Sequence, residues 1–280
     1  MATDRPLSPY LCPVCAESLA LQPSGKSYQC PRRHNFDLAR EGYLNLLPVQ
    51  HKHSLEPGDS RQMLAARRAF LEAGHYEPMA KAVAAMIAAG RPEDGMIRLL
   101  DVGCGEGYYG RNLGALCRRL ELHGVDIAKA AVAAAAKKLP AARYIVASTN
   151  RLPYVDRYFD ALLRVFAPSN EGELQRVLRP SGQLLIVTPG PRHLAQLKAF
   201  LYTELREHAE EIILPQGFER LGTQRISYRI TPGRAERAAL LQMTPFAWRA
   251  SKSMRQALDE PETLSIETDF ILTLAIKTAE

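Results

Sequence analysis

The chain has 280 residues, of which 46% are hydrophobic and 24% are charged. This balance excludes a disordered chain, and the length suits one large α/β domain with a small appendage. No apolar run reaches the roughly 18 residues that a membrane-spanning helix needs, and residues 1–20 lack the pattern of a secretion signal. We therefore expect a cytoplasmic protein with no membrane partner. The formal charge of +6 at pH 7 is a weak indication of a polyanionic partner.

Three of the five cysteines lie before residue 31 and form a pattern with one histidine. Cys12 and Cys15 are separated by two residues, and after a gap of fourteen residues Cys30 is followed four positions later by His34. Three thiolates and one imidazole are a closed tetrahedral ligand set for structural zinc. A segment of about forty residues buries too little surface to fold alone, so a metal replaces the missing core. We predict a zinc-binding module at residues 1–50.

Residues 51–90 are predicted to be a linker and a helical segment. His51 and His53 are alternative metal ligands, although a charged, solvated loop is the simpler interpretation. A turn then caps a helix that we expect from about Arg61 to Ala73. On this helix Arg67 either packs its stem and turns its head to water, or contacts a phosphate. The sequence leaves both alternatives open.

A buried strand ending at Asp101 and Val102 runs into a glycine-rich loop, which lets backbone approach a bound nucleotide closely. Gly105 and Gly107 belong to a dinucleotide fingerprint, and an acid follows Gly105 by 21 residues, where a ribose-binding acid is expected. However, Asp101 and Glu106 flank the loop with negative charge that would repel a pyrophosphate. S-adenosylmethionine carries a sulfonium, an ammonium and no phosphate, so we predict it as the cofactor.

Strands and helices alternate from residue 97 to residue 190, which predicts a mainly parallel, doubly wound sheet. An antiparallel pair at Gln224–Ile230 and Glu267–Lys277 would complete it as a mixed sheet. We expect residues 91–280 to form a Rossmann-like class I S-adenosylmethionine-dependent methyltransferase domain of the α/β class. A long helix is expected to begin near Pro189 and to run to about Glu210.

Ligands of such sheets bind at the carboxyl ends of the strands, and the candidate cofactor contacts lie there. Asp126, after the second strand, either accepts both ribose hydroxyls or caps the next helix. Asn150 and Leu152 follow the third strand and would meet the adenine, while the loop 167–170 would face the methyl group. His193 is either a residue of the cleft or a surface residue of the expected helix. The predicted set from the residues is Asp101, Gly103, Gly105, Glu106, Gly107, Asp126, Asn150 and Leu152.

Long strings outside the cofactor loop resemble the bacterial 23S ribosomal RNA guanine-N1 methyltransferases, which modify a domain II hairpin of the large subunit. These strings include Glu41–Lys52, Pro57–Ser60, Ala66–Leu71, Gly74–Tyr76, Thr188–Leu194 and Leu241–Ala250. The resemblance implies methyl transfer from S-adenosylmethionine to guanine N1. It also implies a homodimer that forms an RNA-binding cleft.

The resemblance implies site residues as well. Zinc should be bound by Cys12, Cys15, Cys30 and His34, and the zinc module should help to grip the RNA hairpin. Cofactor contacts should include Tyr76, Glu106, Gly107 and His193, with Asp126 at the ribose. No residue is predicted to act as the catalytic base.

Three alternatives stay open. The cofactor loop by itself also fits a small-molecule methyltransferase. A sister group of the family modifies a neighbouring guanine and confers macrolide resistance. A non-catalytic, zinc-stabilised RNA-binding protein is the third alternative. Near the C-terminus, Trp248 either stacks on a base or packs beneath a loop, and packing is the commoner case.

Overall fold

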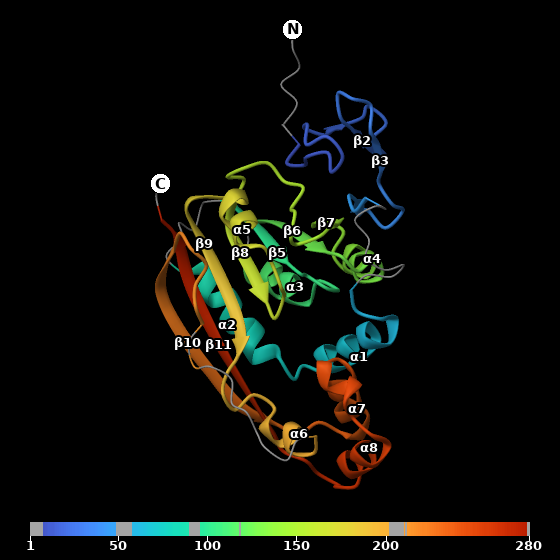
Figure 1. Ribbon diagram of the computed structural model, residues 1–280, viewed down its shortest axis with the longest axis vertical. Coiled ribbons are helices and arrows are strands. Elements are labelled where there is room, and N and C mark those ends of the chain that lie inside the picture. Colours follow the sequence, from blue (N-terminus) through green and yellow to red (C-terminus); the bar gives the residue numbers. More distant parts are fainter. Residues whose placement is uncertain are drawn as a thin grey trace.

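The computed structural model describes residues 8–48, 58–89, 96–117, 119–201, 210 and 212–278. Its centre is an eight-stranded sheet in the order β10-β11-β9-β8-β5-β6-β7-β4 (Figure 1). The strands are β4 (Leu44–Asn45), β5 (Ile97–Val102), β6 (Leu120–Asp126), β7 (Arg143–Val146), β8 (Phe159–Val165), β9 (Leu178–Pro189), β10 (Phe218–Ile230) and β11 (Ile266–Lys277).

The sheet is mixed, as the sequence predicts. The pairs β5–β6, β6–β7, β5–β8 and β8–β9 are parallel, whereas β11 pairs antiparallel with both β9 and β10. The strand order reverses at β5, so the carboxyl ends of β5, β6 and β8 meet at the position where ligands of doubly wound sheets bind. The predicted antiparallel pair at the C-terminal end of the chain is confirmed.

Helices cover both faces of this sheet (Figure 1). Neighbouring residues of the central strands point to opposite faces, so Leu99 and Leu163 belong to one apolar cluster and Leu100 and Leu162 to the other. The helices are α1 (Arg61–Glu72), α2 (Glu77–Ala88), α3 (Tyr108–Leu116), α4 (Lys129–Lys138), α5 (Glu171–Val177), α6 (Ala195–Ala199), α7 (Arg234–Gln242), the 3-10 helix η2 (Pro245–Trp248) and α8 (Lys252–Asp259). No helix among the described residues is long and apolar enough to span a bilayer.

The N-terminal module is a small three-stranded antiparallel sheet attached to the large one. It consists of β1 (Ala20–Leu21), β2 (Ser27–Gln29) and β3 (Asn35–Asp37). Tyr10 forms a bridge with Tyr154, and the amide of Leu11 donates to the carbonyl of Pro153 at 3.0 Å. The segment after the module adds β4 to the large sheet, parallel to β7. The module is therefore fastened to the edge of the sheet at both of its ends.

The expected long helix to Glu210 is wrong in its first part. Residues up to 194 form turns, α6 spans just Ala195–Ala199, and residues 202–209 lie outside the described part of the chain, as do His51 and His53. The amides of Arg192 and Leu194 donate to acceptors on β11, and Leu194 has a left-handed φ of +57°. Tertiary hydrogen bonds to β11 thus replace the helical ones at this position.

Candidate cofactor site and zinc centre

The four predicted zinc ligands come together in the N-terminal module. The ligand atoms of Cys12, Cys15, Cys30 and His34 all lie within 4.8 Å of one another. The sulfurs of Cys15 and Cys30 are 3.6 Å apart, and His34 Nδ1 is 3.5 Å from Cys12 Sγ and 3.3 Å from Cys30 Sγ. Ligands at about 2.0–2.3 Å from a tetrahedral zinc are separated by about 3.5–3.8 Å. These three separations are near that range, so the four residues can hold a zinc ion, with His34 binding through Nδ1.

Two similar turns bring these ligands together. In each, a cysteine carbonyl accepts a hydrogen bond from a later amide, from Ala16 to Cys12 and from Arg33 to Cys30, both at 2.8 Å. Ala16 and Arg33 have left-handed φ values of +61° and +66°. Each turn directs the side chains of its ligand pair toward the same metal position. The close spacing of the two ligands in each pair therefore sets the geometry of that half of the centre.

The loop after β5 has the backbone that a nucleotide-binding loop requires. Gly103, Gly105 and Gly107 all have positive φ, at +74°, +54° and +73°. A Cβ on Gly103 would lie 2.4 Å from the Cβ of Ala167, whereas a Cβ on Gly105 would meet nothing within 4 Å. The backbone at Gly105 therefore faces open space that a bound cofactor can fill.

Asp126 connects this loop to the end of β6. Its Oδ2 accepts from the amide of Gly105 at 2.9 Å, and its Oδ1 accepts from the amide of Ala128 at 2.8 Å. Burial raises the pKa of Asp126. Each carboxylate oxygen has a second lone pair, so the side chain can still accept two hydroxyl donors. Asp126 thus holds the loop and can bind a ribose, but it is not the N-cap of α4, which is Ala128.

Asp101 is buried beneath the loop, with a side chain 2% exposed. Its Oδ2 has no hydrogen-bond partner among the described residues. Burial and the neighbouring carboxylate of Asp126 raise the pKa of Asp101 to about 7. An unpaired buried acceptor fits a ligand that brings a donor or a positive charge. This observation fits S-adenosylmethionine better than it fits a dinucleotide.

The structure pairs Glu106 with cations from two helices. Arg68 donates Nε and Nη2 to its two carboxylate oxygens at 2.6 and 2.5 Å, and Lys138 Nζ lies 3.5 Å away. The negative charge that the sequence argument placed at Glu106 is therefore neutralised by α1 and α4. Discrimination against a pyrophosphate then depends on Asp101 and Asp126 rather than on Glu106.

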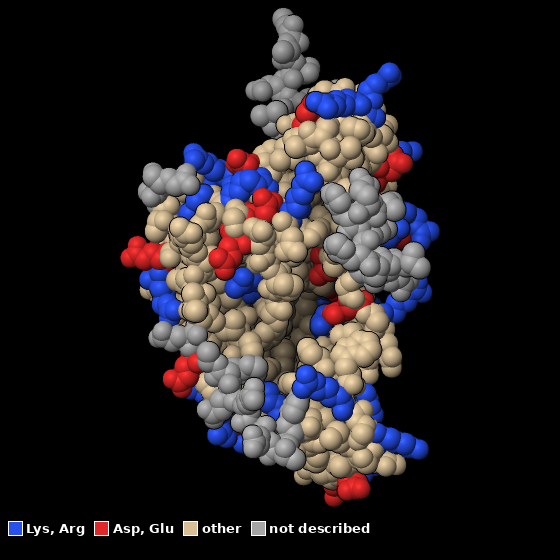
Figure 2. All heavy atoms as spheres, viewed as in Figure 1, with Lys and Arg blue, Asp and Glu red and all other residues tan. Residues whose placement is uncertain are grey.

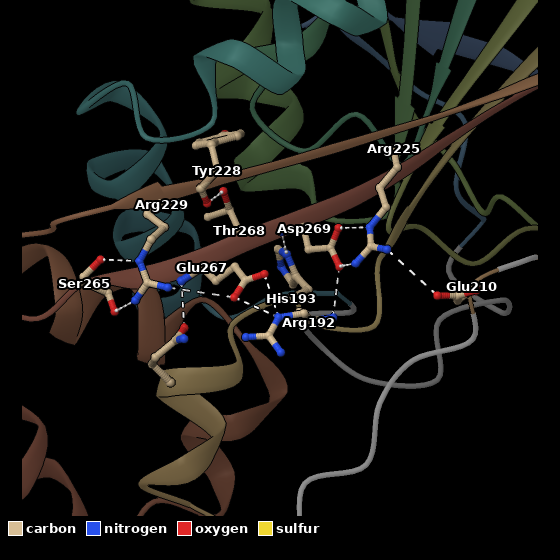
Figure 3. Close-up of polar contacts among 11 residues, drawn as sticks. Arg192, His193, Glu210, Arg225, Tyr228, Arg229, Ser265, Glu267, Thr268 and Asp269 are labelled. Carbon is tan, nitrogen blue, oxygen red and sulfur yellow. Dashed lines mark hydrogen bonds and ion pairs between the residues drawn. The ribbon is translucent and has the colours of Figure 1, made fainter.

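Tyr76 and His193 meet in the core although 117 residues separate them. The amide of Asp269 donates to His193 Nδ1 at 3.2 Å, so the imidazole proton lies on Nε2 (Figure 3). Nε2 is 3.4 Å from the Tyr76 hydroxyl and donates to it. Burial raises the pKa of Tyr76, which keeps its own proton as a donor. His193 is 8% exposed and lies in a turn, so it is not a surface residue of a helix.

The two residues predicted near the adenine lie in different surroundings. Asn150 is exposed in the loop after β7, next to the segment that follows β8, where Thr149 Oγ1 donates to the carbonyl of Pro168 at 2.9 Å. Leu152 is 2% exposed and packs in the cluster that joins the N-terminal module to the sheet. Its amide donates to Glu173 and its carbonyl accepts from the Arg176 guanidinium. Contact between Leu152 and an adenine stays a prediction.

Sequence reasoning missed Phe166. The apolar pattern predicts a fourth strand over residues 158–166, but β8 ends at Val165. Phe166 has a left-handed φ of +52° and is 45% exposed. For an L-residue this backbone costs about 1–2 kcal/mol. The signal in the sequence was an aromatic residue at the carboxyl end of a buried strand.

The molecular surface has a hollow near the carboxyl ends of the central strands. Figure 2 shows it between the carboxyl ends of β8 and β9 and the helices α1 and α7, whose places Figure 1 gives. Ser60 caps the N-terminus of helix α1. Gly58, two residues earlier, packs against Ile127 and Ala128, and a Cβ added to Gly58 would lie 3.0 Å from the side chain of Ala128. The segment that precedes α1 therefore lies against the residues that follow Asp126.

Comparison with known proteins agrees with both parts of the chain. Residues 10–55 match the zinc-ribbon family model described as "RlmA, N-terminal", and residues 99–182 match a methyltransferase domain. A protein of Micromonospora griseorubida named "Putative 23S rRNA (guanine-N(1)-)-methyltransferase" is 36% identical over 92% of this chain and 95% of its own length. The chain belongs to the 23S rRNA guanine-N1 methyltransferase family. The 23S rRNA (guanine(748)-N(1))-methyltransferase of Streptomyces fradiae is 35% identical over 85% of each chain.

Family membership makes the chain an S-adenosylmethionine-dependent methyltransferase with an N-terminal zinc ribbon. Relatives of other function match less of it. A malonyl-[acyl-carrier protein] O-methyltransferase of Halorhodospira halophila is 34% identical, but over 36% of this chain. The two relatives named above as 23S rRNA methyltransferases therefore match 92% and 85% of this chain, whereas this relative matches 36% of it.

Proposed function

We propose that this protein transfers the methyl group of S-adenosylmethionine to N1 of a guanine in a domain II hairpin of 23S ribosomal RNA. The observation that carries the proposal is the extent of the match, because the rRNA methyltransferase of Micromonospora griseorubida aligns over the ribbon as well as the core. A cofactor fold alone is shared by enzymes of many substrates, so the substrate must be argued from the additional parts. The reaction is assigned to the cytoplasm, where its RNA substrate is found.

The proposal assigns the cofactor to the loop after β5 and its surroundings. Asp126 binds the ribose, Asp101 faces the positive end of the cofactor, and the Tyr76 hydroxyl, held by His193, donates into the site. When bound, the cofactor supplies a methyl group on a sulfonium that is already activated. The full proposed set is Tyr76, Asp101, Gly103, Gly105, Glu106, Gly107, Asp126, Asn150, Leu152 and His193, within the proposed division 1–50, 51–90 and 91–280.

The chain's own contribution to the reaction is position. A guanine in a paired stem buries its N1 in a hydrogen bond, so the base must leave its stack to reach the cleft. Holding N1 in line with the sulfonium methyl then accounts for much of the acceleration. As N1 takes the methyl group, the sulfur leaves as a neutral thioether and the N1 proton passes to water. The ribbon, fastened to the edge of the sheet through Tyr10 and Leu11, is proposed to hold the hairpin.

The experiment uses the zinc-loaded protein, methyl-labelled cofactor and an unmodified transcript of the domain II hairpin. Label should appear at one guanine, and a methyl on N1 should stop reverse transcription there because it blocks the pairing edge. A transcript with that guanine replaced by adenine is the control. Label on a quinone or another metabolite but not on RNA would support the small-molecule alternative. Failure to bind S-adenosylmethionine in calorimetry would support the non-catalytic one.

The proposal also includes a homodimer, which rests on the family resemblance. Light scattering should give twice the chain mass of 31.1 kDa. A monomeric mass in the presence of the RNA hairpin would contradict this part of the proposal and leave the reaction itself untouched.

A further inference from the structure

Phe166 lies where a doubly wound sheet presents its ligand, at the carboxyl end of β8. The residue is 45% exposed and its backbone is left-handed, a conformation that proteins seldom impose on an aromatic residue. The amide of Phe166 donates to the carbonyl of Val187 at 3.2 Å, so β9 holds the residue in this conformation. Backbone strain of this kind concentrates at functional sites, and the cofactor contacts proposed above do not use Phe166.

The surroundings of Phe166 place it on a wall of the cofactor cleft. The next residue, Ala167, approaches Gly103 closely. A Cβ added to Gly103 would lie 2.4 Å from the Cβ of Ala167. On the other side, the ring centroid of Phe166 is 6.0 Å from that of His193 and 6.1 Å from that of Phe270. Phe166 thus precedes the residue that approaches the first glycine of the cofactor loop, and its ring lies beside the imidazole of His193 in the turn after β9.

We propose that Phe166 is the platform on which the acceptor base stacks after it leaves the RNA hairpin. The inference rests on the proposed function, which supplies the guanine. Once N1 has lost its proton, the lone pair that attacks lies in the plane of the base, so a ring parallel to the base fixes the plane of attack and leaves every edge atom open. Stacking on an aromatic ring also compensates for the stacking that the base loses in the hairpin.

Charge beside this wall fits the phosphates of that nucleotide. Arg192, Arg225 and Arg229, here called the arginine row, are oriented by two acids (Figure 3). Arg225 donates Nε and Nη2 to the buried carboxylate of Asp269 at 2.8 Å each. Arg192 Nε is 2.8 Å from Glu267, and Arg229 Nη1 is 4.0 Å from it. The three arginine side chains remain 45–56% exposed, so oriented guanidinium groups face solvent.

A hydrogen bond connects the arginine row to the aromatic wall. Asp269, which holds Arg225, donates its amide to His193 Nδ1, and His193 is the ring beside Phe166. Glu210 lies 3.9 Å from Arg225, but its side chain is 78% exposed, so water screens this pair and a phosphate can replace it. An aromatic platform next to oriented arginines is the combination that binds an unstacked nucleotide.

The test replaces the flat ring and keeps its apolar volume. In Phe166→Leu, kcat/KM for the RNA hairpin at saturating S-adenosylmethionine should fall about 5- to 150-fold, the range expected for one lost base stack. Affinity for S-adenosylmethionine should stay within about twofold, since the ring is not a cofactor contact. Phe166→Trp should restore most of the activity. Ile213→Ala is the control for the loss of an exposed apolar side chain, because Ile213 is 97% exposed in the segment before β10, and its kcat/KM should stay unchanged.

A second measurement tests the phosphates. Arg229→Gln should lower the slope of log affinity for RNA against log salt by about 0.7, the value for one phosphate of a single strand. Phe166→Leu should leave that slope unchanged. Arg229 is suited to this test because Glu267 still forms an ion pair with Arg192 after Arg229 is replaced.

The outcomes separate the inference from the proposed function. Wild-type protein that does not methylate the hairpin overturns the proposed function and the inference together. If the wild type is active and Phe166→Leu is equally active, the inference alone is overturned. It is also overturned if Phe166→Leu and Phe166→Trp lose the same activity. A loss of cofactor affinity equal to the loss of activity would also overturn it, since Phe166 would then belong to the cofactor site.

Discussion

The contact between Gly103 and Ala167 predicts a difference between two substitutions in the same loop. An alanine at Gly103 would adopt a φ of +74° and place its Cβ 2.4 Å from the Cβ of Ala167. The left-handed backbone costs about 1–2 kcal/mol. The contact joins atoms that cannot rotate away, so the backbone must shift, which costs about 1–3 kcal/mol more. We expect Gly103→Ala to lower the free energy of unfolding by about 2–5 kcal/mol.

Gly105→Ala is the matched control. Its φ of +54° carries the same backbone cost, but the new Cβ meets nothing within 4 Å, so the loss should be about 1–2 kcal/mol. The methyl group would instead enter the space proposed for the cofactor and weaken its binding. Urea unfolding of zinc-loaded protein gives both stabilities, and calorimetry gives the affinity of Gly105→Ala for S-adenosylmethionine. Equal loss of stability in the two variants would refute the close approach of Ala167 to the loop.

Three further predictions follow from the same geometry. Asp126→Asn should weaken S-adenosylmethionine binding by about 10- to 150-fold in calorimetry, because an amide cannot accept from two backbone donors and two hydroxyls; unchanged affinity would exclude the ribose contact. Cys30→Ser should abolish stoichiometric zinc in a chelator assay, while Cys117→Ser, outside the ribbon, should retain it; zinc retained by both would show a different ligand set. Burial lowers the pKa of His123, so the unfolded chain binds a proton that the folded chain rejects, and stability should fall as the pH drops below about 6.5. In His123→Phe, urea midpoints at pH 7 and pH 5 should differ less than in the wild type, and an equal difference would contradict this account.

Local patterns in the sequence determined much of this protein. The spacing within each zinc-ligand pair is that of a single turn, and the strand that runs into Gly103 and Gly105 specifies a nucleotide-binding loop through backbone conformation alone. Alternating strands and helices gave the mixed sheet and its antiparallel end, because each element buries its own apolar face. The substrate was reached through family resemblance, since no local pattern specifies a guanine.

Only the tertiary structure decided the charges and rings that surround the cofactor loop. The partner of Glu106 is Arg68, 38 residues away, and the acceptor that draws the Arg192 amide out of a helix is Asp269, 77 residues away. Trp248, for which packing was the commoner expectation, is 80% exposed. Phe166 has a left-handed backbone that its own sequence disfavours. Such features depend on which strands and helices become neighbours in the fold. A local sequence pattern does not specify hydrogen-bond partners that lie tens of residues away along the chain.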